Sequence, residues 1–255
     1  MTEPDRVLPL LWRHATPTPD PAVPRRGPRQ KFSVDDVVDA AIEIADRDGL
    51  PSLSMRGLAQ HLGMGAMTLY TYVPNRTDLI VLMVDQVFGR TTLPEHPDDL
   101  RQRLKLVARV QYEECRAHPW LLEVSGLRVW LGPHVADRYE WQLSAVEGIG
   151  LDDIEMDQTV TLLASFGTSI ARAEQAVRQA ERESGLTDAE WWEANYEALT
   201  EVMAGHDYPV AGRVGTAAGE AYQAASDQRR ELNFGLARIV DGLLAHLDPP
   251  AQTGD

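Results

Sequence analysis

Apolar residues along this chain recur every three to four positions, the spacing of an α-helix, from residue 33 almost to the C-terminal end. The first helical segment begins at Ser33, and Gly49 is suited to end it. Ser33 and Asp36 match a capping box. One face of this segment is apolar, through Val34, Val37, Val38, Ala41 and Ala45. The pattern therefore predicts a helix that opens an ordered domain.

Three shorter helical segments follow, and two of them carry a clear start signal. Ser54 can cap the first, which ends in a turn at Gly63. Residues 66–72 predict a second helix of about two turns. Asn75 can cap the third, which runs to about Phe88.

Beyond residue 97 the helical pattern continues, interrupted by Gly and Pro separators. The predicted helices are 98–117, 119–129, 134–147, 152–183, 187–203 and 227–247. The stretch 204–220 is rich in Gly and Ala and is predicted to be a mobile loop. No segment shows the alternation of a strand, so the fold is predicted to be all-α.

The first 30 residues contain seven prolines and no helical periodicity. We expect a disordered or extended arm, which ends in the basic run RRGPRQK at residues 25–31. The arm lacks an apolar run of the length that a signal peptide needs, and the chain lacks one that could cross a membrane. These observations predict a cytoplasmic protein that does not bind membranes.

Charge is distributed unevenly along the chain. The net charge of −15 argues against nucleic acid at first sight. However, residues 1–31 hold six basic against three acidic residues, or +3, whereas residues 91–255 hold 14 against 28, or −14. A basic N-terminal end can therefore approach DNA if the acidic part is held away from it.

The run LGMGAMTLYTYVPNR at residues 62–76 has the features of a helix-turn-helix. Gly63 supplies a left-handed corner, and Leu69 alone is expected to face the core. The side chains expected to point outward are Met67, Thr68, Thr71 and Tyr72. Such a helix suits the major groove of DNA, although the same spacing also occurs at a plain helical corner.

The segments SMRGLAQHLG and TLYTYVPN, in this order and spacing, closely resemble the TetR family of bacterial repressors over residues 32–88. The resemblance implies a three-helix DNA-binding domain at 32–90, after a flexible basic arm at 1–31. It also implies a homodimer that reads a palindromic operator in double-stranded DNA. The residues that it places at the DNA are Ser54, Arg56, Gly65, Ala66, Met67, Thr68, Tyr70, Tyr72 and Arg76.

Gly65 and Ala66 carry no hydrogen-bonding side chain, so this helix should make few direct hydrogen bonds to the bases. The basic arm can compensate, because extended arginine-rich arms enter the minor groove. Its candidate residues are Arg25, Arg26, Arg29 and Lys31. The alternative is a solvated basic linker.

Two further segments, HPWL at 118–121 and FGLARIVDGLLAHL at 234–247, resemble the tetracycline-repressor branch of the family. This implies a larger helical domain at 91–255 that binds a small-molecule effector and dimerises through the helices at 152–183 and 227–247. The alternative is that the apolar stripe of the last helix packs only within the subunit.

The candidate ligand-binding residues are bulky or polar side chains of the middle helices: Trp120, Trp130, Tyr139, Trp141, Gln142, Phe166, Arg172 and Trp192. Gln142 matches a position that helps to hold the drug in tetracycline repressors. Trp130 stands where those proteins have a metal-coordinating histidine. We therefore expect no metal or cofactor, and a natural-product-like effector other than tetracycline.

The sequence contains no pattern of residues typical of an enzyme active site. The seven histidines show no ligand spacing, and Cys115 on an apolar helix is typical of buried packing. The predicted function is a ligand-responsive repressor, released by its effector, that controls an efflux or resistance gene. The alternative is an architectural DNA-binding protein without a ligand switch, which would not lose DNA affinity when a ligand is added.

Overall fold

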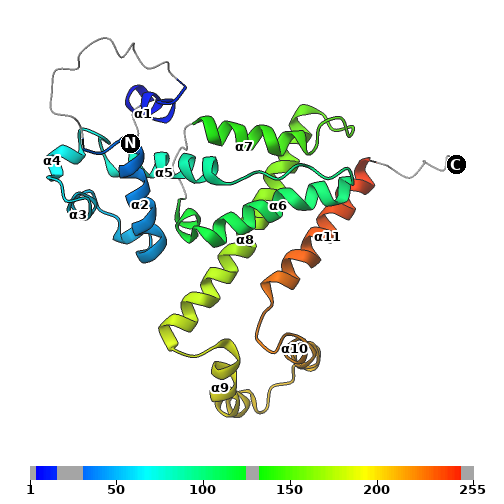
Figure 1. The fold of residues 1–255 in the computed structure, drawn as a ribbon. Coiled ribbons are helices and arrows are strands. Elements are labelled where there is room, and N and C mark those ends of the chain that lie inside the picture. The colour runs from blue at the N-terminus through cyan, green and yellow to red at the C-terminus, as the bar shows by residue number, and fades with distance from the viewer. Residues whose placement is uncertain (1–3, 16–30, 125–131, 248–255) are drawn as a thin grey trace, which may run out of the picture. The chain divides into compact units, whose positions relative to one another are not determined.

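The computed structural model describes residues 4–15, 31–124 and 132–247. These residues form helices and no strand, which confirms the all-α prediction (Figure 1). None of their helices is both long and apolar enough to cross a membrane.

The chain divides into two compact units. Unit 1 comprises residues 1–103 and 117–160, and unit 2 comprises residues 104–116 and 161–255. The long helices α6 and α8 each contribute residues to both units.

Unit 1 contains the predicted helix-turn-helix. Its helices are α1 (Pro4–Leu11), α2 (Val34–Asp48), α3 (Met55–His61), α4 (Ala66–Leu69), α5 (Arg76–Arg90) and α7 (Pro133–Ser144), with 3-10 turns at Leu50–Ser52 and Pro119–Glu123. The shared helices are α6 (Leu100–Ala117) and α8 (Asp153–Ser184). Unit 2 adds α9 (Asp188–Met203), α10 (Pro209–Tyr222) and α11 (Gln228–Leu247).

The predicted helix starts are confirmed by their hydrogen bonds. Ser33 and Asp36 form a reciprocal capping box at the start of α2. Ser54 and Asn75 cap α3 and α5 through side-chain oxygens that accept a backbone N–H. Gly63 has a φ of 63°, the left-handed corner that the turn between α3 and α4 requires.

The core of unit 1 lies between α2, α3, α4 and α5. Val37, Leu58, Leu69 and Leu79 are each completely buried there. The apolar face of α5 is buried along most of its length, from Leu79 to Val87. The short recognition region is thus held by a continuous apolar core rather than by its own helix propensity.

The prediction of an extended arm is wrong for its first part, because residues 4–11 form α1. Val7 and Leu11, one helical turn apart, are 0% and 1% exposed. This burial offsets the hydrogen bond that Pro9 removes from the helix. The short amphipathic helix was not predicted because the segment around it is rich in proline. Residues 16–30 lie outside the described residues.

The prediction of a mobile loop at 204–220 is also wrong. Residues 209–222 form α10, which starts with Pro209 in its first turn. Alanine favours the helix enough to tolerate three internal glycines. The helix predicted at 119–129 is only a 3-10 turn at Pro119–Glu123, and residues 125–131 lie outside the described residues.

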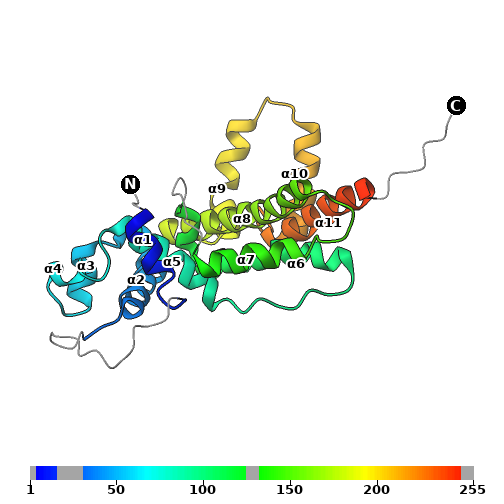
Figure 2. The ribbon, with the colours of Figure 1, turned by 90° about the horizontal axis from the view of Figure 1, so that it is seen from above.

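Unit 2 is built on close helix contacts. At Gly167 of α8, a Cβ atom would lie 2.3 Å from the carbonyl oxygen of Ala108 of α6. At Gly235 of α11, a Cβ atom would lie 2.2 Å from the ring of Phe166. Figure 2 shows α9 and α10 extending away from α8 and α11. These two helices contain no buried residue.

Candidate DNA-binding surface and ligand site

The recognition helix α4 presents small and apolar side chains to solvent. Met67 is 79% and Tyr70 is 44% exposed, and Thr68 lies beside them on the surface. Leu69 is fully buried, as predicted. Gly65 precedes the helix in extended conformation, so no side chain blocks approach to its first turn.

Tyr72 does not point outward as expected. It is only 6% exposed and belongs to the core of unit 1. Leu69, Tyr72 and Val73 are spaced three and four residues apart, so they fall on one face of the helical turns that end α4. The sequence reasoning assigned Tyr72 to the wrong face.

Arg76 is held by the protein itself. Its Nε donates a hydrogen bond to the carbonyl oxygen of Leu53, and its Nη2 donates one to that of Leu50, both at 2.7 Å. These bonds tie the start of α5 to the turn before α3. A phosphate contact by Arg76 stays a prediction, but no local sequence pattern indicates this structural role.

Ser54 and Arg56 lie exposed at the start of α3. The Ser54 hydroxyl accepts the N–H of Gly57 at 3.1 Å. Lys31 is exposed before α2, with its amine 5.3 Å from the centre of the Phe32 ring. Arg25, Arg26 and Arg29 lie outside the described residues.

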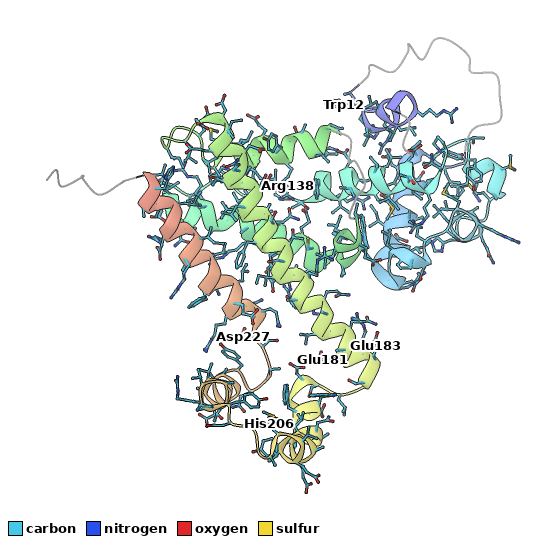
Figure 3. The ribbon with its side chains drawn as sticks, turned by 180° about the vertical axis from the view of Figure 1, so that it is seen from behind. Trp12, Arg138, Glu181, Glu183, His206 and Asp227 are labelled. Carbon is cyan, nitrogen blue, oxygen red and sulfur yellow. The ribbon has the colours of Figure 1, made fainter. Side chains whose placement is uncertain are left out.

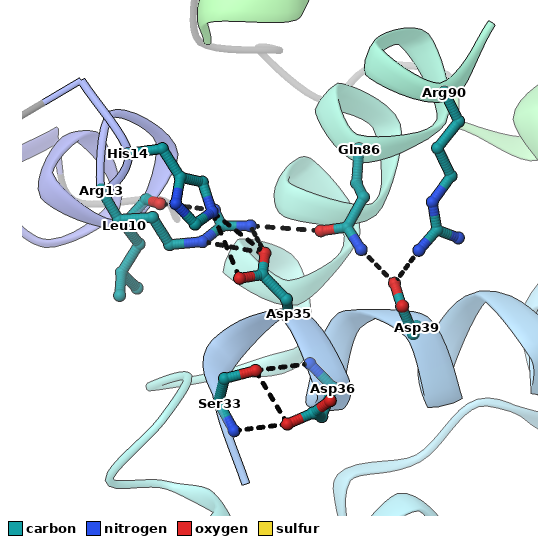
Figure 4. Close-up of polar contacts among 9 residues, drawn as sticks. All are labelled: Leu10, Arg13, His14, Ser33, Asp35, Asp36, Asp39, Gln86 and Arg90. Atoms are coloured by element: carbon teal, nitrogen blue, oxygen red, sulfur yellow. Dashed lines mark hydrogen bonds and ion pairs between the residues drawn. The ribbon is translucent and has the colours of Figure 1, made fainter.

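A polar network joins the turn that directly follows α1 to α2 and α5 (Figure 4). We call it the α1 network, and its members are Arg13, His14, Asp35, Asp39, Gln86 and Arg90. Arg13 binds Asp35 and donates a 3.1 Å hydrogen bond to Gln86. Gln86 and Arg90 both donate to Asp39. Hence α1 and the turn after it are tied to α2 and α5 by charge as well as by packing.

The pKa of Asp35 reflects this network. Burial alone would raise the pKa, but hydrogen bonds from Arg13 and His14, and their positive charge, hold it below its usual value. Asp35 is therefore ionised whenever α1 is docked at neutral pH.

The predicted ligand-binding residues of unit 1 are placed differently from one another. Trp120 is 1% exposed and donates a hydrogen bond to Asp46 of α2, so it is part of the core. On α7, Gln142 is buried, and Tyr139 donates to Asp157 at 2.7 Å. Trp141 stacks on His96 with ring centres 4.7 Å apart. Trp130 lies outside the described residues.

The predicted ligand-binding residues of unit 2 do not form one group. Phe166 of α8 packs against Gly235, whereas Arg172 is exposed. Trp192 of α9 is 45% exposed and contacts Trp191 edge to face. The structure therefore does not bring these three side chains together in a single cavity.

Unit 2 contains a cavity of about 260 Å³ that the sequence reasoning missed. It is lined by Tyr112, Arg116, Glu174, Tyr222, Ser226, Asp227, Gln228 and Arg229. Figure 3 marks Asp227, one of the lining residues, directly before the start of α11. The lining combines two aromatic rings with charged groups of both signs, which suits a molecule that has a ring system and polar substituents.

A hydrogen-bonded cluster forms one wall of this cavity. The Tyr112 hydroxyl donates to Glu174, and Arg116 donates to the same carboxylate at 3.1 Å. Burial, and then the bond to Glu174, raise the pKa of Tyr112 to about 12. Burial would raise the pKa of Glu174, but the bonds from Tyr112 and Arg116 lower it overall. The wall therefore offers a neutral phenol and a carboxylate that is ionised at neutral pH.

The spacing of Tyr112 and Arg116, one helical turn apart, was the available signal for this wall. Nothing in the sequence linked them to Glu174, some 60 residues later. In the described part of the chain no cluster of three or more His, Cys, Asp or Glu side chains could hold a metal ion. Cys115 is buried, and this burial raises the pKa of its thiol.

Comparison with known proteins agrees with the helix-turn-helix and the helical body. The sequence profile of the tetracyclin repressor-like C-terminal domain matches residues 93–247. The chain is 38% identical, over 93% of its length and 84% of the relative, to the HTH-type transcriptional repressor DrrR1 of Streptomyces coeruleorubidus. It is 25% identical, over 88% of its length and 96% of the relative, to the class E tetracycline repressor protein of Escherichia coli.

Among solved structures, the TetR family protein ActR of Streptomyces coelicolor in complex with actinorhodin has a TM-score of 0.66. It is 29% identical, over 88% of this chain and 99% of that chain. The fold and the exposed short helix define a helix-turn-helix transcriptional regulator. The chain belongs to the TetR family, whose members are DNA-binding regulators rather than enzymes.

Proposed function

We propose that this protein is a homodimeric repressor that binds a palindromic operator and is released by a natural-product-like molecule. The observation that carries the proposal is the exposed face of α4, in a chain 38% identical to a transcriptional repressor. Two such faces, one per subunit, would reach half-sites about one DNA turn apart. The regulated gene would encode an efflux pump or a resistance enzyme, and the protein would act in the cytoplasm.

In this proposal the base-reading residues are the first positions of α4. Met67 and the methyl group of Thr68 would contact thymine methyl groups. Tyr70, Ser54 and Arg56 would bind phosphates, because they are exposed around the same helix. Arg25, Arg26 and Arg29 would add minor-groove or backbone contacts, so replacing all three with alanine should weaken binding and flatten its salt dependence.

The effector site of the proposal is the cavity of unit 2. Its aromatic and charged lining fits a polycyclic molecule with hydroxyl or carboxyl groups, and the similar protein ActR forms a complex with actinorhodin. Gln142 and Tyr139 belong to α7 of unit 1, and a ligand-binding role for them stays a separate prediction. Binding should not require magnesium.

Dimerisation is supported by apolar side chains left exposed on unit 2. On α8 and α11, Leu162 is 46% and Phe234 is 59% exposed. Gly242 of α11 has open space around it, which permits close approach of another helix. Single exposed apolar residues need no explanation by themselves, so the support comes from their position on α8 and α11, the two helices that the sequence predicts for dimerisation.

The proposed switch is a shift of equilibrium between two states. An effector that binds better to a state with misplaced recognition helices lowers operator affinity by that difference in binding free energy. Helix α5 is the proposed lever, because it runs from the recognition region at Arg76 to the contact with α7.

The test uses the full-length protein and a duplex from upstream of its own gene, followed by fluorescence anisotropy at physiological salt. We expect saturable binding, with two subunits per site, that a scrambled duplex does not reproduce. Actinorhodin, added as a probe, should then lower the affinity. Equal binding to both duplexes and no response to actinorhodin would favour the architectural alternative.

A further inference from the structure

The start of α7 is capped by a residue from another helix. Its own N-cap position is Gly132, which has no side chain to accept a hydrogen bond. Instead, Oδ1 of Asp85 in α5 accepts the backbone N–H of His134 at 3.1 Å and that of Val135 at 3.0 Å. Asp85 is only 4% exposed. Two free N–H groups of α7 are thus satisfied by the middle of α5.

The contact is fitted closely on both sides. A Cβ atom at Gly132 would lie 2.2 Å from Oδ1 of Asp85 and 2.9 Å from a methyl group of Leu11 in α1. A Cβ atom at Gly89 of α5 would lie 2.5 Å from the ring of His134. Two glycines therefore allow α5 and α7 to touch, and α1 covers the contact.

The contact between Asp85 and α7 lies between the helix that reaches α4 and the helix that carries two predicted ligand-binding residues. Helix α5 begins beside the recognition helix, where Arg76 is bonded to the carbonyl oxygens of Leu50 and Leu53. Helix α7 carries the candidate effector residues Tyr139 and Gln142. The buried carboxylate joins the two helices through directed, charge-assisted hydrogen bonds, which tolerate less sliding than apolar packing does.

We propose that Asp85 is the positioning residue that couples α7 to the lever helix α5. A displacement of α7 then moves α5. In the reverse direction, DNA binding at the far end of α5 stabilises or destabilises the start of α7, and the coupling free energy is the same in both directions. This inference rests on the proposed function as a DNA-binding regulator. It goes beyond it by assigning the coupling to one carboxylate.

Capping and coupling can be separated by two variants. Asp85→Ala removes both. Asp85→Ala combined with Gly132→Asp restores a cap from the N-cap position of α7 itself, because the lost carboxylate makes room for the new side chain and the Leu11 methyl group, at the end of a flexible side chain, can shift. Gly132 has a φ of −73° and a ψ of 167°, which any residue adopts. The double variant therefore has a capped α7 that is no longer bonded to α5 through this carboxylate.

Two controls match this chemistry. Asp152 caps α8, where its Oδ1 accepts the N–H of Ile154 and of Glu155, each at 2.9 Å. Asp152→Ala loses the same kind of bonds at an exposed helix start. Asp85→Asn keeps an oxygen that accepts both N–H groups, so it should preserve the coupling.

The readout is amide hydrogen exchange, by mass spectrometry, of a peptide covering residues 133–140, with and without the upstream duplex. In Asp85→Ala without DNA, exchange should be roughly fivefold faster, and the double variant should restore the slow rate. In the wild type, DNA should change exchange of this peptide. That change should disappear in the single and double variants and persist in Asp85→Asn and Asp152→Ala.

A DNA-dependent change that persists in the double variant would overturn the proposal. The same holds if the wild type binds the duplex with no change in this peptide. Absence of sequence-selective binding would instead refute the proposed function, and the coupling with it. Anisotropy measured on the same samples distinguishes these failures.

Discussion

Helix α5 and the pair α9–α10 are both well-formed helices, but they differ in what holds them. Nearly every apolar residue of α5 between Leu79 and Val87 is buried. In contrast, α9 and α10 bury no residue, and they leave Trp191, Trp192 and Tyr196 more than a third exposed. Both regions have sound local signals, since α9 starts with a capping box and α10 with Pro209. Local signals form helices, but only burial makes them part of a stable unit.

The largest effect should follow from a cavity in the α5 core. Leu82 is 1% exposed, so Leu82→Ala should lower the free energy of unfolding by about 3 kcal/mol. The measurement is urea denaturation at several protein concentrations. A loss below about 1 kcal/mol would mean that the core of unit 1 is less tightly packed than its burial indicates.

Removal of the Arg76 guanidinium should have the next largest effect. Arg76→Ala removes the donor to the carbonyl oxygen of Leu53 and leaves that of Leu50 with the N–H of Leu53 alone, and it should cost about 2 kcal/mol of unfolding free energy. Arg76→Lys should recover little, because one amine cannot reproduce two bonds of fixed geometry. Unchanged stability together with weaker DNA binding would make Arg76 a phosphate contact alone.

The exposed helix pair should respond through association rather than through folding. We expect the exposed aromatic residues of α9 to extend the interface proposed for α8 and α11, so Tyr196→Ala should raise the dimer dissociation constant about tenfold, as loss of an aromatic interface residue does. The free energy of unfolding measured on the monomer should stay the same. Glu193→Ala on the same helix is the control, and analytical ultracentrifugation is the measurement. Equal dissociation constants for both variants would place the interface elsewhere.

Two tyrosines near α4 sharpen the contrast between surface and core. Tyr70→Phe should weaken operator binding by about 1 kcal/mol if the hydroxyl of this exposed residue binds a phosphate, as proposed. Tyr72→Phe should leave operator binding nearly unchanged, since its ring is 6% exposed. Anisotropy titrations would show both. Reversed effects would mean that Tyr72 turns outward on DNA.

The smallest effect concerns pH. The folded-state pKa of Asp35 is lowered, so its ionised form stabilises the fold above its unfolded value of 3.8. This contribution is lost as the pH falls from that value through the folded pKa. Arg13→Gln should therefore make stability fall less steeply below about pH 4, which urea denaturation at a series of pH values would test. Curves of equal slope for both proteins would argue against docking of α1 through Asp35.

The sequence predicted the helix-turn-helix well because its signals are local. Ser33, Ser54, Asn75 and Gly63 each act within a few residues, through caps or a left-handed turn. The errors arose where distant packing decides. Helix α1 exists because Val7 and Leu11 are buried, which no local pattern reveals in a proline-rich segment.

The candidate ligand site was harder to predict for the same reason. Trp120 was chosen for its size, yet it fills the core beneath α2. Tyr112 and Arg116 were passed over because their partner Glu174 lies on another helix. A list of bulky residues identifies candidates, whereas the cavity depends on which helices cross and how closely.

The close contact at Gly167 limits how the cavity of unit 2 can adapt. There α8 rests directly on the backbone of α6 at Ala108, so no side chain can repack to change the distance between the two helices. Glu174 and Tyr112 lie only two turns and one turn beyond this contact. The Tyr112–Glu174 wall is therefore preformed, and an effector that fits it would lose little free energy in ordering it. Selectivity would then arise by exclusion, since a molecule of the wrong width could not spread the helices to enter.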